Sequence, residues 1–170
     1  NIQSKQDVFV QGLGDADVIG LHQAGGQTAI QLFFYRSDRN YGTRTVFPSH
    51  NKDVESPEIL AAFIAQYYAE NAPPPLLLLS EKPRDHALIE DALSEKAGRN
   101  VKLAIPQQQR KKTLIQQACQ NAAEALSRKM ASTAEQKKLL RNVQKLFEVS
   151  KPIKRIEVYD NSHISGKHAV

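Results

Sequence analysis

The hydrophobic pattern of this 170-residue chain changes its period near Ser56, and that change restricts the possible folds more than any other feature. Before Ser56, short apolar runs with turn signals between them are typical of β-strands. These runs cover residues 17–23, 28–36 and 44–47. Gly25 and Gly26, and then Asn40–Gly42, predict the two hairpin turns that join them. Ser56 as N-cap and Pro57 predict a helix start, and apolar residues then recur at helical spacing.

Strands and helices alternate after this first helix. Pro73–Pro75 end it, and Leu76–Leu79 reads as a strand buried on both faces. A second helix over 85–97, ended by Gly98, and a strand over 101–105 follow. The pattern next predicts a long helix from about Arg110 to Met130.

A capping box at Ser132–Glu135 predicts a separate helix that runs to Phe147, and Pro152 precedes a new strand at Ile156. The predicted order is therefore βββαβαβα, followed by a helical connector and one further strand. Three antiparallel strands followed by alternating helices and strands predict an α/β fold, with helices packed on a mixed sheet. Ribonuclease H-like folds have this succession of elements.

Composition excludes several classes of protein. Hydrophobic residues make up 41% and charged residues 24%, which is ordinary for a globular domain. The longest purely apolar run, Leu76–Leu79, is far shorter than the roughly 20 residues of a membrane-spanning helix, and no secretory signal opens the chain. The single cysteine, Cys119, excludes an internal disulfide and a cysteine-cluster metal site. We therefore expect a cytoplasmic protein without a membrane partner.

Positive charge is concentrated in one segment. Residues 107–155 contain 12 basic and 3 acidic side chains, whereas the net charge of the whole chain is +5. Such a segment predicts a polyanionic partner, most simply nucleic acid, although a solvated helical face gives the same pattern. The candidate phosphate-binding residues are Arg110, Lys111, Lys112, Lys137, Lys138, Arg141, Lys145, Lys154 and Arg155.

The last residues carry a specific motif. Residues 155–166 read R-I-E-V-Y-D-N-S-H-I-S-G, which closely resembles the opening segment of the ribonuclease H-like nuclease domain of the UvrC family. That family supplies the incision subunit of the bacterial nucleotide excision repair excinuclease. Supporting matches to the middle region of the family lie at 15–21, at 25–27 together with 31–34, and at 74–80. The resemblance extends over essentially the whole chain.

The resemblance implies a function and a division into domains. It implies an internal part of a longer DNA-incising subunit, which nicks damaged double-stranded DNA with UvrB as a partner. Residues 1–14 would be a lead-in, 15–131 a non-catalytic ribonuclease H-like domain, 132–154 a basic helical connector, and 155–170 the start of the endonuclease domain.

The resemblance also implies the metal chemistry. Asp160 would be the first acid of an Asp-Asp-His set that holds Mg²⁺ or Mn²⁺ in the intact protein, with His163 as a supporting residue. One carboxylate cannot form such a site, so we expect neither a bound metal nor catalysis in this chain alone. On composition alone, Asp160 is a turn residue.

The middle region has no convincing carboxylate set of its own. Asp15 and Asp17 stand at the start of the first strand, and the fourth strand ends in Ser80 and Glu81. We therefore interpret this region as a scaffold that positions DNA or a protein, with Asp17 as a metal ligand as the lesser alternative. An unrelated α/β interaction module would require the terminal motif to be a coincidence.

Overall fold

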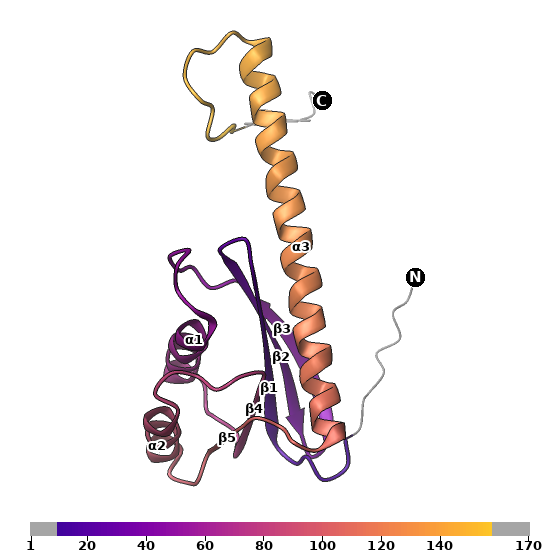
Figure 1. Cartoon of the computed structure of the whole chain (residues 1–170), viewed down its shortest axis with the longest axis vertical. Coiled ribbons are helices and arrows are strands. Elements are labelled where there is room, and N and C mark those ends of the chain that lie inside the picture. Colours follow the sequence, from indigo (N-terminus) through magenta and orange to yellow (C-terminus); the bar gives the residue numbers. More distant parts are fainter. Residues whose placement is uncertain (1–9, 158–170) are drawn as a thin grey trace, which may run out of the picture. The chain divides into compact units, whose positions relative to one another are not determined.

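The structure is a computed structural model that describes residues 10–157. Contacts within the chain divide it into two units, Asn1–Lys129 and Met130–Val170. Figure 1 shows the elements. The strands are β1 Ala16–Ala24, β2 Gln27–Arg36, β3 Arg39–Val46, β4 Leu76–Leu79 and β5 Lys102–Ala104, and the helices are α1 Ser56–Glu70, α2 His86–Ala97 and α3 Gln109–Leu146.

The first unit contains a five-stranded mixed sheet with the strand order β3-β2-β1-β4-β5. Strand β1 pairs antiparallel with β2 and parallel with β4, and β4 pairs parallel with β5. The connections through α1 and α2 make these parallel pairings possible. This confirms the predicted α/β class and the ribonuclease H-like order of strands and helices.

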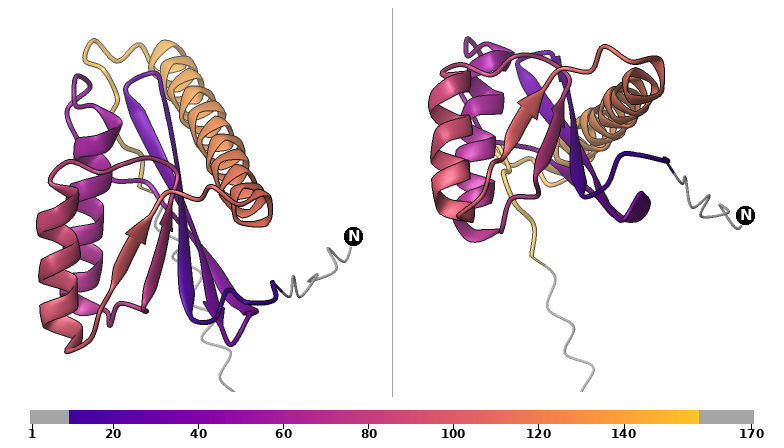
Figure 2. Two further views of the ribbon diagram at one scale, coloured as in Figure 1. Left: turned by 60° about the horizontal axis from the view of Figure 1, so that its bottom comes forward. Right: turned by 90° about the horizontal axis from the view of Figure 1, so that it is seen from below.

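The two faces of the sheet are covered by different helices (Figure 2). Alternate residues of β1 separate between two cores: Ile19 and Leu21 pack with α1 and α2, whereas Ala16 and Val18 pack with α3. Leu76–Leu79 divides in the same way, so it is a central strand buried on both faces, as its unbroken apolar sequence predicts.

Gly20 sets how closely α3 approaches the sheet. A Cβ atom at this position would lie 2.6 Å from the Ala118 Cβ and 2.6 Å from the backbone nitrogen of Cys119. The small side chains at these positions therefore allow β1 and α3 to pack in direct contact. Cys119 itself is half-buried.

The second hairpin turn does not lie at Asn40–Gly42, where we predicted it. Ser37 and Asp38 form it, with φ values of 49° and 68°. Asn40 pairs with Tyr35 and Gly42 with Phe34, so Tyr41 is the extra residue of a β-bulge inside β3. The Asp38 carboxylate accepts hydrogen bonds from the backbone N–H groups of Gly12 and Gly14, at 3.2 and 2.5 Å, and these bonds hold the turn.

The predicted helix boundaries are partly wrong. Glu55 and not Ser56 is the N-cap of α1, and the Ser56 hydroxyl instead donates to Glu81 of the β4–α2 loop at 2.8 Å. Helix α2 ends at Gly98 in the left-handed conformation, as predicted, and Leu88 on this helix is 69% exposed.

The capping box at Ser132–Glu135 does not start a helix, because these residues lie inside α3. No proline or glycine interrupts 107–151, so nothing in the local sequence forces a break.

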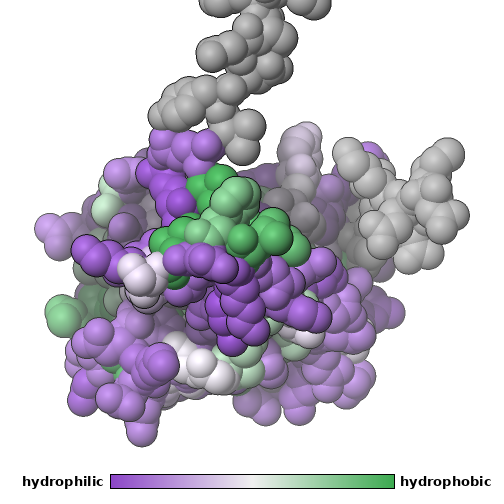
Figure 3. Space-filling model, turned by 90° about the horizontal axis from the view of Figure 1, so that it is seen from above, coloured by the Kyte–Doolittle hydropathy of each residue, from purple (hydrophilic) through white to green (hydrophobic). Residues whose placement is uncertain are grey.

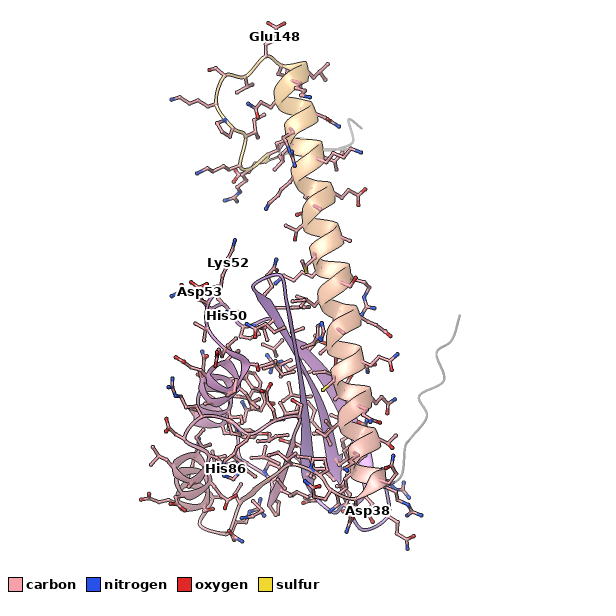
Figure 4. The ribbon with its side chains drawn as sticks, viewed as in Figure 1. Asp38, His50, Lys52, Asp53, His86 and Glu148 are labelled. Carbon is pink, nitrogen blue, oxygen red and sulfur yellow. The ribbon has the colours of Figure 1, made fainter. Side chains whose placement is uncertain are left out.

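The second unit contains the last part of α3 and the residues that follow it. The helix ends at Leu146, and Glu148 then adopts a left-handed conformation with φ of 48° (Figure 4). Residues 152–157 have no regular secondary structure, and the rest of the strand predicted from Ile156 lies outside the described residues. Among residues 10–157, no helix combines the length and the hydropathy that crossing a membrane requires.

Candidate nucleic-acid interface

Four predicted DNA-binding residues lie on one side of α3 in the second unit. Lys137, Arg141 and Lys145 are spaced by four residues, and Lys138 stands beside them. At 3.6 residues per turn, these four side chains fall within an arc of about 100° around the helix axis. We call this group the basic arc. All four residues are exposed, and none takes part in the five ion pairs among residues 10–157.

The basic arc has the chemistry of a phosphate-binding surface. Glu135 is the only acidic residue between Met130 and Phe147. Solvated lysine and arginine side chains at helical spacing can follow a phosphate backbone without reading the bases. The long stems also allow the charges to move onto phosphates of varied geometry.

Arg110, Lys111 and Lys112 lie in the first unit, in the first turn of α3. Arg110 and Lys112 are exposed and Lys111 is half-buried. Positive charge at a helix N-terminus opposes the helix dipole, so this cluster does not stabilise the helix. The three residues are consecutive and form one cluster of positive charge.

The remaining predicted site residues follow α3. Lys154 and Arg155 are exposed, and Arg155 forms an ion pair with Glu157 at 2.6 Å. Asp160 and His163 lie outside the described residues, so their predicted roles stay predictions.

Asp17 is held in a buried network inside the first unit. The residue is 1% exposed, and its Oδ1 accepts from Arg36 Nη1 at 2.9 Å. Its Oδ2 accepts from the hydroxyl of Tyr68, which is itself fully buried, at 2.6 Å. Burial raises the pKa of Asp17, and the hydrogen bonds from Tyr68 and Arg36 lower it in part. Burial and the neighbouring Asp17 charge raise the pKa of Tyr68 well above its usual range. Both oxygens of Asp17 are therefore occupied by groups that join β1, β2 and α1.

The positions where a ribonuclease H-like fold would need metal-binding acids carry other residues. The middle of β1 is Ile19–Leu21, and at the end of β4 the Ser80 hydroxyl accepts from the Leu21 N–H at 3.2 Å. Glu81 accepts a hydrogen bond from Ser56. Within residues 10–157, no three His, Cys, Asp or Glu side chains are grouped so that they could hold a metal ion. The described residues therefore do not fit Mg²⁺ or Mn²⁺.

The aromatic side chains are mainly structural, as their spacing predicts. Phe33, Tyr35, Phe63 and Tyr68 are buried, while Tyr41 is 78% exposed at the bulge in β3. Tyr41 is thus accessible to a partner, and it lies inside a strand and not in a turn.

Sequence reasoning missed two features. One is Arg36 as the partner of Asp17, which depends on pairing between strands. The other is an apolar side of α3 in the second unit, where Leu139, Leu146 and Phe147 are 57%, 77% and 70% exposed. The spacing of Leu139, Val143 and Leu146 at four and three residues could have indicated this second feature.

Comparison with known proteins agrees with the fold. Residues 15–129 match the family model described as the UvrC ribonuclease H-like domain. Over its whole length the chain is 48% identical to UvrABC system protein C of Hyphomonas neptunium. Over 99% of its length it is 48% identical to the protein of the same name from Paramagnetospirillum magneticum. The chain spans 28% and 27% of the length of these two relatives. On this evidence the chain belongs to the family of UvrC ribonuclease H-like domains.

Proposed function

We propose that this chain is a non-catalytic, DNA-contacting scaffold within the DNA-incising subunit of the nucleotide excision repair excinuclease. Its relatives are named as components of the UvrABC system. In the longer protein it would act together with UvrB on damaged double-stranded DNA, in the cytoplasm. The longer protein would be the enzyme, a metal-dependent endonuclease, and this region would help to hold its substrate.

The observation that carries the proposal is the basic arc. Four exposed cations gather on one side of α3, and a repair protein needs contacts of this kind because lesions occur in every sequence context. Binding to phosphates meets that need, since it is independent of base sequence.

The other basic residues contribute in different degrees. Arg110, Lys111 and Lys112 are a second candidate patch, because their charge opposes the helix dipole and the first turn of α3 contains no acidic residue. Lys154 is free to contact DNA, whereas Arg155 would first have to leave Glu157. Exposed ion pairs of this type are weak, at about 0–1 kcal/mol, so the exchange costs little.

Incision itself would depend on residues outside the described range. By its resemblance to the family motif, Asp160 would bind Mg²⁺ or Mn²⁺ in the longer protein, with His163 close by. The metal would activate water for attack on the phosphodiester. The buried Asp17 would serve the fold of the first unit and not this chemistry.

The salt dependence of DNA binding tests the proposal. The affinity of the chain for a duplex of about 20 base pairs would be measured at several salt concentrations, for the unchanged chain and for Lys137→Gln/Lys138→Gln/Arg141→Gln/Lys145→Gln. Each lost phosphate contact reduces the slope of log affinity against log salt by about 0.9. We expect the slope to fall by about 3 to 4.

A matched control loses the same charge elsewhere. Arg39→Gln/Lys52→Gln/Lys82→Gln/Arg84→Gln removes four exposed cations from the first unit, all outside α3. This variant should keep most of the slope. An equal decrease of the slope in the two variants would show that only net charge matters. A negligible affinity of the unchanged chain for the duplex would refute DNA binding by this region.

A further inference from the structure

The last turns of α3 have an apolar side as well as a basic one. Leu139, Leu140, Val143 and Leu146 fall within an arc of about 120° around the helix axis, and Phe147 follows directly after the last residue of the helix. We call these five residues the apolar face. Lys138 lies about 80° from Leu146 around the helix, and Lys137 about 60° from Leu140, so basic residues border the apolar face on both sides.

This face is exposed in the second unit. Leu139, Leu146 and Phe147 are 57%, 77% and 70% exposed, and five of the eight exposed large hydrophobic residues among 10–157 lie between 139 and 156. Figure 3 views the molecule from the end where α3 finishes and shows apolar surface gathered there between hydrophilic side chains. Single exposed leucines are ordinary, but a contiguous apolar patch with a polar border is typical of an interaction site.

The chain that follows α3 is hydrogen-bonded to the end of the helix. The Val149 N–H donates to the Gln144 carbonyl, and the Gln144 side-chain amide donates to the Val149 carbonyl, each at 3.1 Å. On this side of the helix Leu140 and Val143 are half-buried, while Leu139, Leu146 and Phe147 stay exposed. The exposed part extends about 12 Å along the helix, from Leu139 to Phe147.

The charge around the apolar face indicates which kind of partner it would bind. Residues 130–157 contain seven basic and three acidic side chains, so a second copy of this chain would bring like charges together. A short amphipathic protein segment with acidic flanks matches both the apolar face and its basic border.

We propose that the apolar face of α3 is a docking site for an acidic amphipathic helix of a protein partner. The apolar side chains of that helix would pack on Leu139, Leu146 and Phe147, and its carboxylates would lie beside Lys137 and Lys138. Arg141 and Lys145 of the basic arc lie away from the apolar face, whereas Lys137 and Lys138 belong to both surfaces, so DNA and the docked helix would compete at these two residues.

Binding of designed peptides to the 170-residue chain tests this proposal. Three fluorescent 18-residue peptides would be titrated: one with leucines at i, i+3, i+4 and i+7 and glutamate flanks, one with the same leucines and lysine flanks, and one with the acidic sequence scrambled. We expect the acidic amphipathic peptide to bind at least tenfold more tightly than either of the others.

A matched pair of neutral substitutions then locates the site. Leu146→Gln should weaken binding of the acidic amphipathic peptide about tenfold, whereas Leu88→Gln, at a position 69% exposed on α2, should leave it unchanged. Both positions are exposed, so both variants should keep the far-UV circular dichroism of the unchanged chain.

Three results would overturn the proposal. The first is binding of the scrambled peptide as tightly as the acidic amphipathic peptide, or an equal loss of affinity for the acidic amphipathic peptide in Leu146→Gln and Leu88→Gln. The second is a dimer, seen by analytical ultracentrifugation, that Leu146→Gln dissociates. The third is attachment to anionic phospholipid vesicles that requires Leu146 while the peptides do not bind.

Discussion

Removing one hydroxyl group from Tyr68 tests the account of Asp17 as a structural residue. Tyr68→Phe keeps the buried ring and deletes the O–H that donates to Asp17 Oδ2 at 2.6 Å. No cavity forms around the ring, so the cost comes from the lost hydrogen bond to a carboxylate that is 1% exposed. Hydrogen bonds to charged groups contribute about 1.5–3 kcal/mol, and we expect the free energy of unfolding to fall by that amount.

The decrease in the free energy of unfolding caused by Tyr68→Phe should depend on pH. Burial raises the pKa of Asp17 above its ordinary value of 3.8, and the Tyr68 hydrogen bond opposes that rise. An acid whose pKa is raised by folding binds its proton more tightly in the folded state. Its contribution to stability therefore falls as pH rises from 3.8 through the folded-state pKa. The variant raises this pKa further, so its destabilisation should be larger at about pH 7 than at about pH 4.

Urea unfolding at the two pH values, followed by tyrosine fluorescence and circular dichroism, measures these differences. Tyr67→Phe is the matched control, because the Tyr67 hydroxyl makes no hydrogen bond within residues 10–157, and it should change stability by less than about 0.5 kcal/mol. A Tyr68→Phe loss that is as small as that of the control, or identical at both pH values, would refute the reasoning.

The remaining predictions concern other elements. Gly20→Ala would place a Cβ atom 2.6 Å from Ala118 and should destabilise the first unit by about 1–3 kcal/mol, measured by urea unfolding; an unchanged midpoint would contradict the close packing of β1 on α3. Hydrogen bonds from the N–H groups of Gly14 and Gly12 lower the pKa of Asp38, so its contribution to stability is present above about pH 3.8 and is lost as pH falls through the lowered pKa. In Asp38→Asn the midpoint temperature of thermal unfolding should therefore depend less on pH in this range. A pH dependence equal to that of the unchanged chain would contradict this prediction. Ser132→Ala lies inside α3, so helicity should be unchanged or slightly higher, whereas a capping role would cost about 1 kcal/mol. In the longer protein, Asp160→Asn should abolish the nick 5′ to a lesion and spare the 3′ nick on an end-labelled duplex; survival of both nicks would make Asp160 a turn residue.

The order of the strands and helices could be predicted because it depends on sequence patterns of neighbouring residues. The unbroken run Leu76–Leu79 indicated a central strand, and Gly98 marked a helix end that the structure confirms. The basic arc could be predicted too, since Lys137, Arg141 and Lys145 recur every four residues. In each case the residues that decide the structure are close in sequence.

The wrong predictions concern features that depend on contacts between residues far apart in the sequence. Asp38 is 24 and 26 residues from the glycines whose N–H groups it binds, and these bonds favour a turn at Ser37 and Asp38 over the more turn-prone Asn40–Gly42. Asp17 meets Arg36 and Tyr68 across 19 and 51 residues. The capping box failed for another reason: Ser132 and Glu135 are compatible with a helix interior when nothing else interrupts it.

Photocrosslinking from α3 to DNA tests the central claim most directly. A benzoylphenylalanine residue would replace Arg141 on the basic arc or, as the control, Asp91, which is exposed on α2. Each protein would be irradiated with an end-labelled duplex. If the basic arc contacts DNA, position 141 should give a crosslink that disappears at high salt, and position 91 little or none. Equal crosslinking from both positions, or none from position 141, would contradict a DNA-contacting role for the basic arc.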